Sequence, residues 1–202
     1  MNNRLLGTIA LICSPALFIE GITLQNENHI VIGIASMVFM AGWACSNIAM
    51  QRMQAIGTGL AAKIVLRVQL FGILMAFLFG FLEATKLVSE DNLFFIITDM
   101  CWPLSMVFMI VVGSMAIRAK RWAGWQRFVP LFCAAWLPVA MIIGMVAAGN
   151  PNVEMISGNI GFAWTFVAWG LLALVVRSNA TLAGVPVHAT VDPEIEALTN
   201  AG

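Results

Sequence analysis

The sequence predicts an all-α membrane protein, a bundle of about six transmembrane helices with both termini in the cytoplasm. Composition, the length of the apolar stretches and the placement of positive charge predict this architecture. Of the 202 residues, 61% are hydrophobic and only 10% are charged, whereas a soluble domain carries about 25% charged residues. A water-soluble fold of this length could not bury so much apolar surface, so lipid must be part of its solvent.

The apolar stretches have the length that a membrane requires. A transmembrane helix needs about 20 mostly apolar residues, because each residue rises about 1.5 Å. Six stretches qualify: 5–24, 30–51, 64–86, 93–117, 128–148 and 156–176. The first is too long for a signal-peptide core and lacks a small-residue cleavage site, so we assign it as a helix. The transmembrane domain therefore covers residues 1–177, and the polar tail 178–202 is predicted to be a disordered cytoplasmic extension.

The positive charges set the orientation, because Lys and Arg concentrate in cytoplasmic connections. Of the ten Lys and Arg residues, only Lys86 lies in the first, third or fifth loop. The other nine lie at the N-terminus, in the second and fourth loops and at the C-terminal flank: Arg4, Arg52, Lys63, Arg67, Arg118, Lys120, Arg121, Arg127 and Arg177. We therefore expect both termini in the cytoplasm and a location in the plasma membrane. The zero net charge offers no basic field for nucleic acid.

Three carboxylates fall inside the predicted spans, close to the outer side of the membrane. A rise of about 1.5 Å per residue places Glu20 about 6 Å, Glu83 about 4–5 Å and Asp99 about 9 Å from their outer helix ends. A charged group at the bilayer centre costs about 2.5–3.5 kcal/mol on insertion scales, and less toward the surface. Asp99 therefore needs compensation, and Lys86 is the outward cation that we expect to pair with it.

The residues after Asp99 suggest a binding site. Trp102 and Pro103 follow it at i+3 and i+4, on the same face of a helix. Because proline has no N–H, Pro103 leaves the Asp99 carbonyl without its helical hydrogen bond. We expect an outward-facing acidic pocket for a cation, a small cationic or amphipathic ligand or a proton, formed by Asp99, Trp102, Pro103, Glu83 and Glu20. The alternative is that both glutamates are interfacial and that Asp99 is a structural carboxylate at a kink.

Two further prolines lie inside predicted spans. Pro15 is in the first span and Pro138 in the fifth. Each is expected to kink its helix and to free the carbonyl four residues earlier, that of Leu11 or of Ala134. In lipid these carbonyls must find another hydrogen-bond donor.

Small residues at four-residue spacing allow membrane helices to approach closely. Gly72, Ala76 and Gly80 form such a stripe on the third predicted span. The stripe predicts a compact bundle with this span at its centre. It is also the candidate surface for a homo-oligomer or another membrane partner.

The sequence contains none of the common catalytic, nucleotide-binding or metal-binding motifs. Patterns such as G-x-S-x-G, H-E-x-x-H and G-x-x-x-x-G-K-[ST] are absent, and no cysteines form C-x-x-C. We therefore predict no cofactor, no metal site and no catalytic residues, and we favour non-enzymatic binding or transport. Two alternatives stay open: an intramembrane enzyme that uses Asp99 or Glu83 on a lipophilic substrate, and an accessory subunit of a membrane complex.

Overall fold

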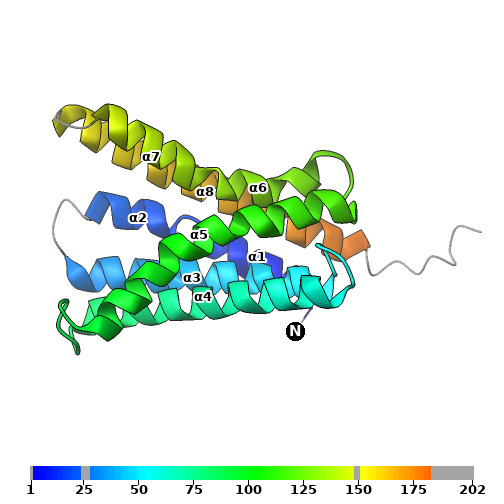
Figure 1. Cartoon of the computed structure of the whole chain (residues 1–202), viewed down its shortest axis with the longest axis horizontal. Helices are drawn as coiled ribbons and strands as arrows, with labels where there is room; N and C mark the ends of the chain where they lie inside the picture. The colour runs from blue at the N-terminus through cyan, green and yellow to red at the C-terminus, as the bar shows by residue number, and fades with distance from the viewer. Residues whose placement is uncertain (1, 24–27, 148–150, 183–202) are drawn as a thin grey trace, which may run out of the picture.

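The computed structural model describes residues 2–23, 28–147 and 151–182, and no strand occurs in these ranges. The helices are α1 (Asn3–Cys13), α2 (Ala16–Thr23), α3 (His29–Arg52), α4 (Leu60–Thr85), α5 (Leu93–Ala119), the 3-10 helix η2 (Gly124–Phe128), α6 (Val129–Ala134), α7 (Trp136–Ala147) and α8 (Pro151–Leu182). The all-α prediction is confirmed (Figure 1). The first residues of the predicted tail continue α8, and residues 183–202 lie outside the described part.

Four helices of the described chain are long and apolar enough to cross a membrane: α3, α4, α5 and the part of α8 from Ile160 to Ala180. The segments Gly124–Ala134 and Trp136–Ile142 pass the same test together, although a bend of 46° separates them. The described residues therefore contain four helices that could span a membrane, or five if this bent pair is one span. The chain is compatible with a multi-pass integral membrane protein.

The prolines act differently at their three positions. At Pro15 the helix breaks: α1 ends at Cys13 and α2 begins at Ala16. The Ser14 hydroxyl donates a hydrogen bond of 2.9 Å to the carbonyl of Leu11, the group that Pro15 leaves without its helical donor. The break between α6 and α7 at Ala135 lies three residues before Pro138, whereas α5 continues through Pro103.

The helix at the centre of the bundle is α3. It packs against α1, α2, α4 and α8, whereas α4 packs mainly against α3 and α5. The prediction that the third span, now α4, is central is therefore wrong. Small residues show where helices approach each other, but they do not show how many neighbours a helix has. Large apolar side chains of α4 are exposed along its length: Leu60, Ile64, Val68, Phe71, Leu74, Phe77 and Phe81.

The small-residue stripe of α4 is used inside the chain. A Cβ added to Gly80 would lie 2.9 Å from the carbonyl oxygen of Gly33 in α3, and one added to Gly72 would lie 2.4 Å from the Ser105 hydroxyl in α5. Ala76 is fully buried. Glycine at these positions permits close helix contact, because any larger residue would displace a neighbour. That the stripe binds a second chain stays a prediction.

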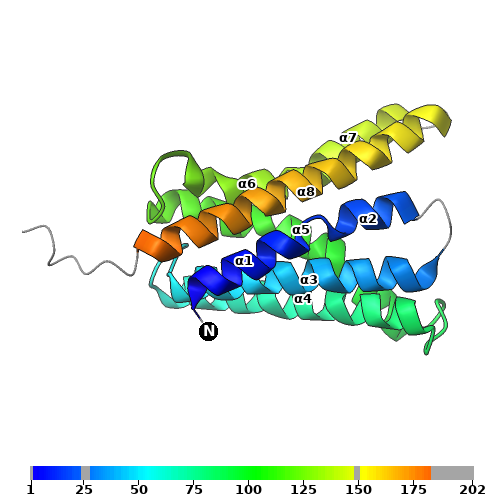
Figure 2. The same cartoon turned by 180° about the vertical axis from the view of Figure 1, so that it is seen from behind.

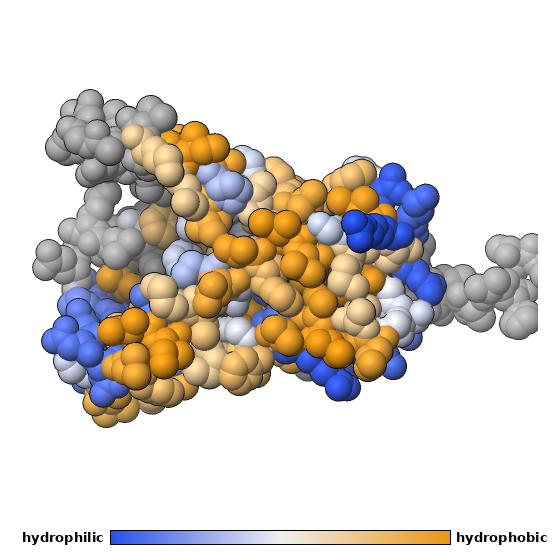
Figure 3. All heavy atoms as spheres, in the orientation of Figure 1, coloured by the Kyte–Doolittle hydropathy of each residue, from blue (hydrophilic) through white to orange (hydrophobic). Residues whose placement is uncertain are grey.

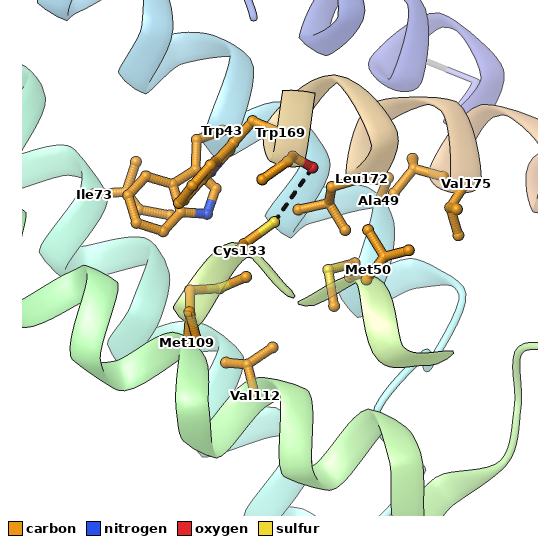
Figure 4. Packing of buried hydrophobic residues seen from close by; sticks show 14 of the residues in the cluster. Trp43, Ala49, Met50, Ile73, Met109, Val112, Cys133, Trp169, Leu172 and Val175 are labelled. Atoms are coloured by element: carbon orange, nitrogen blue, oxygen red, sulfur yellow. Dashed lines mark hydrogen bonds between the residues drawn. The ribbon is translucent and has the colours of Figure 1, made fainter. Parts of the chain in front are cut away.

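Aromatic and sulfur-containing side chains fill the centre of the bundle (Figure 4). The rings of Trp43 in α3 and Trp169 in α8 meet edge to face, with centroids 5.1 Å apart. The Cys133 thiol donates a hydrogen bond of 3.4 Å to the carbonyl of Ala168. This core holds α6 against α8, and α8 against α3.

The two ends of the bundle differ in charge. Figure 3 shows an apolar band between two polar ends. The end where α3 begins and the α4–α5 connection lies is named the acidic end here, and it holds Glu83, Glu90, Asp91 and Asp99. The opposite end, named the basic end, carries the α3–α4 and α5–η2 connections with Arg52, Lys63, Arg67, Arg118, Lys120, Arg121 and Arg127. Figure 2 shows from behind that the α4–α5 connection lies at one end and the α3–α4 and α5–η2 connections at the other.

Candidate functional site

A cavity of about 480 Å³ opens at the acidic end of the bundle and is named the acidic cavity here. Its walls come from α2, α3, α4, α5 and the α4–α5 connection. It is lined by Leu17, His29, Ile32, Ser36, Phe79, Glu83, Glu90, Phe95, Asp99 and Trp102. Three of the five predicted site residues, Glu83, Asp99 and Trp102, therefore share one cavity.

Helical periodicity explains why these side chains converge. On α5, Phe95, Asp99 and Trp102 are spaced i, i+4 and i+7, which is one face of a helix. On α4, Phe79 and Glu83 are four residues apart. The Asn92 side chain fixes where α5 begins, because it accepts a hydrogen bond of 2.8 Å from the N–H of Phe94. This start places Asp99 about 9 Å along the helix, at a rise of about 1.5 Å per residue.

A hydrogen-bonded network of four charged or titratable side chains forms the mouth of the acidic cavity. Lys86 Nζ donates to Glu83 Oε1 at 2.7 Å and to Glu90 Oε1 at 2.9 Å. His29 Nδ1 lies 2.9 Å from the same Glu83 oxygen. The predicted ion pair between Lys86 and Asp99 is wrong: Lys86 follows the last residue of α4 in the left-handed conformation, with φ 49°, and its ammonium contacts Glu83 and Glu90 instead.

The network shifts the protonation of its two loop residues. Burial lowers the pKa of Lys86, but hydrogen bonds to Glu83 and Glu90 outweigh that effect and raise its pKa above the ordinary value. The hydrogen bond from Lys86 and its positive charge hold the pKa of Glu90 below the ordinary value. Both shifts favour the charged forms. Lys86 and Glu90 are therefore charged at neutral pH.

Asp99 lies deeper in the acidic cavity than this network and has no ion pair or hydrogen bond to any described side chain. It is half-buried. The indole N–H of Trp102 is buried and also lacks an acceptor among the described residues. Trp102 packs against Trp136 of α7, with ring centroids 5.5 Å apart, so its position is fixed. The cavity thus presents the carboxylate of Asp99, which has no partner among the described residues, beside the ring of Trp102.

The other two predicted site residues are not among the lining residues. Pro103 is next to Trp102 within α5 but does not line the acidic cavity. The side chain of Glu20 lies outside the described part of the structure. His29 and Glu90 line the cavity and were not predicted. A helix N-cap in the sequence could have placed His29 in a helix. Asn28 is the N-cap of α3 and accepts a hydrogen bond of 3.3 Å from the N–H of Val31, so α3 begins at His29.

No protein family, curated protein or solved structure matches this chain. Across the described ranges, no three His, Cys, Asp or Glu side chains gather closely enough to hold a metal ion. The geometry and charge of the acidic cavity are therefore the observations that bear on function.

Proposed function

We propose that the chain crosses the plasma membrane six times, with both termini in the cytoplasm and the acidic cavity facing outward. Two interrupted segments would supply the remaining passes: α1 with α2, and α6 with α7. A broken helix is tolerated in lipid where its freed carbonyls find other partners, as that of Leu11 does. Six passes place every described Lys and Arg except Lys86 on one side, in agreement with the positive-inside rule.

We propose further that the acidic cavity binds a small cationic, amphipathic ligand, and that the protein acts as a binding or transport protein for it. The observation that carries this proposal is Asp99, a carboxylate in a cavity with no cation opposite it. Three carboxylates line the cavity, Glu83, Glu90 and Asp99, and one ammonium, that of Lys86, contacts two of them. The excess negative charge favours a cation.

The shape and apolar lining of the cavity support the same ligand class. Small-molecule sites commonly measure about 300–1,000 Å³, and this cavity of about 480 Å³ falls in that range. The aromatic rings of Phe79, Phe95 and Trp102 line its walls. A ring face attracts a cation within about 6 Å of its centroid. A proton would bind Asp99 but would make no contact with these aromatic side chains.

An intramembrane enzyme is the second candidate, and the shared cavity favours it. General acid–base chemistry needs two groups that reach one substrate, and Asp99 and Glu83 line the same space. Glu83, however, accepts hydrogen bonds from both Lys86 and His29. A carboxylate held in this way is suited to electrostatic stabilisation and less suited to proton transfer, so we favour binding over catalysis.

Binding of tetraphenylphosphonium, a lipophilic cation, tests the proposal directly. Its affinity would be measured by tryptophan fluorescence on the full chain in nanodiscs of phosphatidylcholine. Asp99→Asn keeps the shape and removes the charge, so we expect affinity to fall at least about tenfold, which is about 1.4 kcal/mol. The matched control is Asp91→Asn, which removes the same charge from an exposed loop position that does not line the cavity.

The control variant should bind within about twofold of wild type, since a screened surface charge contributes little. The neutral analogue triphenylphosphine oxide should bind much more weakly than the cation. Equal affinity of the Asp99→Asn variant and wild type for tetraphenylphosphonium would overturn the proposal.

A further inference from the structure

A second cavity, of about 240 Å³, lies at the basic end between the end of α3 and the start of α4, and is named the basic cavity here. Arg52, Lys63 and Arg67 are among its lining residues, and no Asp or Glu is. It plays no part in the function proposed above. Its charge is opposite to that of the acidic cavity.

Hydrogen bonds between α3 and α4 fix the wall of the basic cavity. Gln51 Nε2 donates to Asn47 Oδ1 at 2.8 Å and to the carbonyl of Leu66 at 3.1 Å. Asn47 is almost fully buried, so this contact is anchored in the bundle. Positive φ angles at Gln54 (53°) and Gly57 (118°) form the turn that closes the end of the cavity. The cavity is therefore preformed by the packing of two long helices.

The cations of α4 at this site have no counter-charge in the described chain. Lys63 and Arg67 make no ion pair with a described residue. All the Asp and Glu side chains that the structure describes lie at the acidic end. From Arg67 to Glu83 the helix rises about 24 Å, at about 1.5 Å per residue, so the carboxylate of Glu83 is far outside ion-pair distance of Arg67. Clustered positive charges without a neighbouring anion repel one another, and a bound anion would relieve that repulsion.

An exposed apolar row runs beside these cations on α4. Leu60, Ile64, Val68 and Phe71 are 74%, 50%, 50% and 64% exposed. With Lys63 and Arg67 they occupy spacings of i, i+3, i+4, i+7, i+8 and i+11 on one helix face. Arg67 is about 10 Å along the helix from its start, where a charge facing hydrocarbon is costly unless it is paired or snorkels to the interface. One face of α4 thus combines a cationic site with a surface for hydrocarbon chains.

We infer that the basic cavity binds a phosphate group, and that this phosphate belongs to the headgroup of an anionic phospholipid. Lys63 and Arg67 hold the phosphate, and the acyl chains lie along the apolar row of α4. Basic pockets between membrane helices on the cytoplasmic side are suited to such headgroups. A free phosphate ion would contact only the two cations. The adjoining apolar row therefore favours a phospholipid over a free phosphate ion.

Lipid binding to the full chain in neutral detergent tests this inference. Dissociation constants would be measured by thermal-shift titration and by native mass spectrometry. The probes are dioctanoyl phosphatidylglycerol, dioctanoyl phosphatidylcholine and inorganic phosphate. We expect the first to bind at least about tenfold more tightly than the second. The Lys63→Gln/Arg67→Gln double variant should lose at least about tenfold in affinity for phosphatidylglycerol.

The matched control is the Arg118→Gln/Lys120→Gln double variant, which removes two cations from the same end but not from the basic cavity. It should bind phosphatidylglycerol within about twofold of wild type. Lys63→Glu, a change at an exposed position, serves as a second variant and should also abolish the preference. Equal losses in the two double variants would overturn the inference, because they would show general attraction to a basic surface. Displacement of the lipid by inorganic phosphate at equal concentration would assign the site to a free ion and overturn the lipid assignment.

Discussion

The acidic and basic cavities lie near opposite ends of the same helix, α4, and their charges run against the dipole of that helix. Lys63 is in the first turns of α4, and Glu83 is in its last turn. A helix favours acidic groups at its N-terminus and basic groups at its C-terminus, by about 0.3–1 kcal/mol each. The reverse arrangement has to be compensated. At the end of α4 the ammonium of Lys86 compensates Glu83, whereas at its start an anion in the basic cavity would supply the missing charge.

The cavities also differ in how they are enclosed. Four helices and a loop surround the acidic cavity, where aromatic rings and Asp99 face the interior. Two helices and a turn form the basic cavity, which adjoins the exposed apolar face of α4. The first arrangement suits a small molecule taken from water, and the second suits a lipid that approaches from the bilayer. Helix packing thus produces two cavities with different lining and different enclosure.

The largest expected effect comes from breaking the helix contact that both cavities share. A Cβ at Gly33 would lie 2.5 Å from the carbonyl oxygen of Gly80. Helix propensity alone favours Ala over Gly by about 1 kcal/mol, but we expect Gly33→Ala to destabilise the protein by about 1–3 kcal/mol through overpacking. Thermal unfolding in detergent measures this, and affinity at both cavities should fall together.

Gly59→Ala is the control for this variant, because no heavy atom lies within 4 Å of a Cβ added there. It should unfold within about 0.5 kcal/mol of wild type. A Gly33→Ala variant as stable as wild type would show that α3 and α4 do not approach as closely as the structure has them.

A smaller effect should distinguish the two cavities. Lys86→Gln removes the ammonium that contacts two carboxylates of the acidic cavity, so affinity for tetraphenylphosphonium should rise by about threefold, or about 0.7 kcal/mol. The Lys86 side chain is 35% exposed, so the loss of stability should stay below about 1 kcal/mol. Lys63→Gln, the control at the basic cavity, should leave affinity for the cation unchanged. Weaker cation binding by Lys86→Gln would mean that Lys86 positions the ligand.

The sequence predicted the all-α fold, because long apolar stretches satisfy their backbone hydrogen bonds within one helix, whereas the six spans stay a prediction, since four or five helices in the described residues are long and apolar enough. Apolar stretches of sufficient length therefore become helices whatever their packing. The breaks were partly predictable: Pro15 coincides with one, whereas α5 continues through Pro103. A proline fixes where a donor is missing, but neighbouring helices decide whether the chain breaks there. The central place of α3 depends on contacts between distant segments, and no local pattern records it.

The candidate site was predictable where a single residue stands out from its surroundings. Asp99 and Glu83 are carboxylates in apolar stretches, and Trp102 lies one helical turn after Asp99. His29 was not predictable in the same way, because its partner Glu83 is 54 residues away in the chain. Lys86 was recognised as the outward cation, but its choice of Glu83 and Glu90 over Asp99 depends on the turn that ends α4.

The central claim is that the acidic and basic ends face opposite sides of the membrane, with the acidic end outside. Cysteine labelling in intact cells tests it most directly, in a background that lacks the four native cysteines. Ser89→Cys and Ala123→Cys place a thiol at an exposed position of the acidic and the basic end, respectively. A membrane-impermeant maleimide should label the Ser89→Cys variant in intact cells and the Ala123→Cys variant only after permeabilisation. Labelling of the Ala123→Cys variant in intact cells, with Ser89→Cys protected, would contradict the claim.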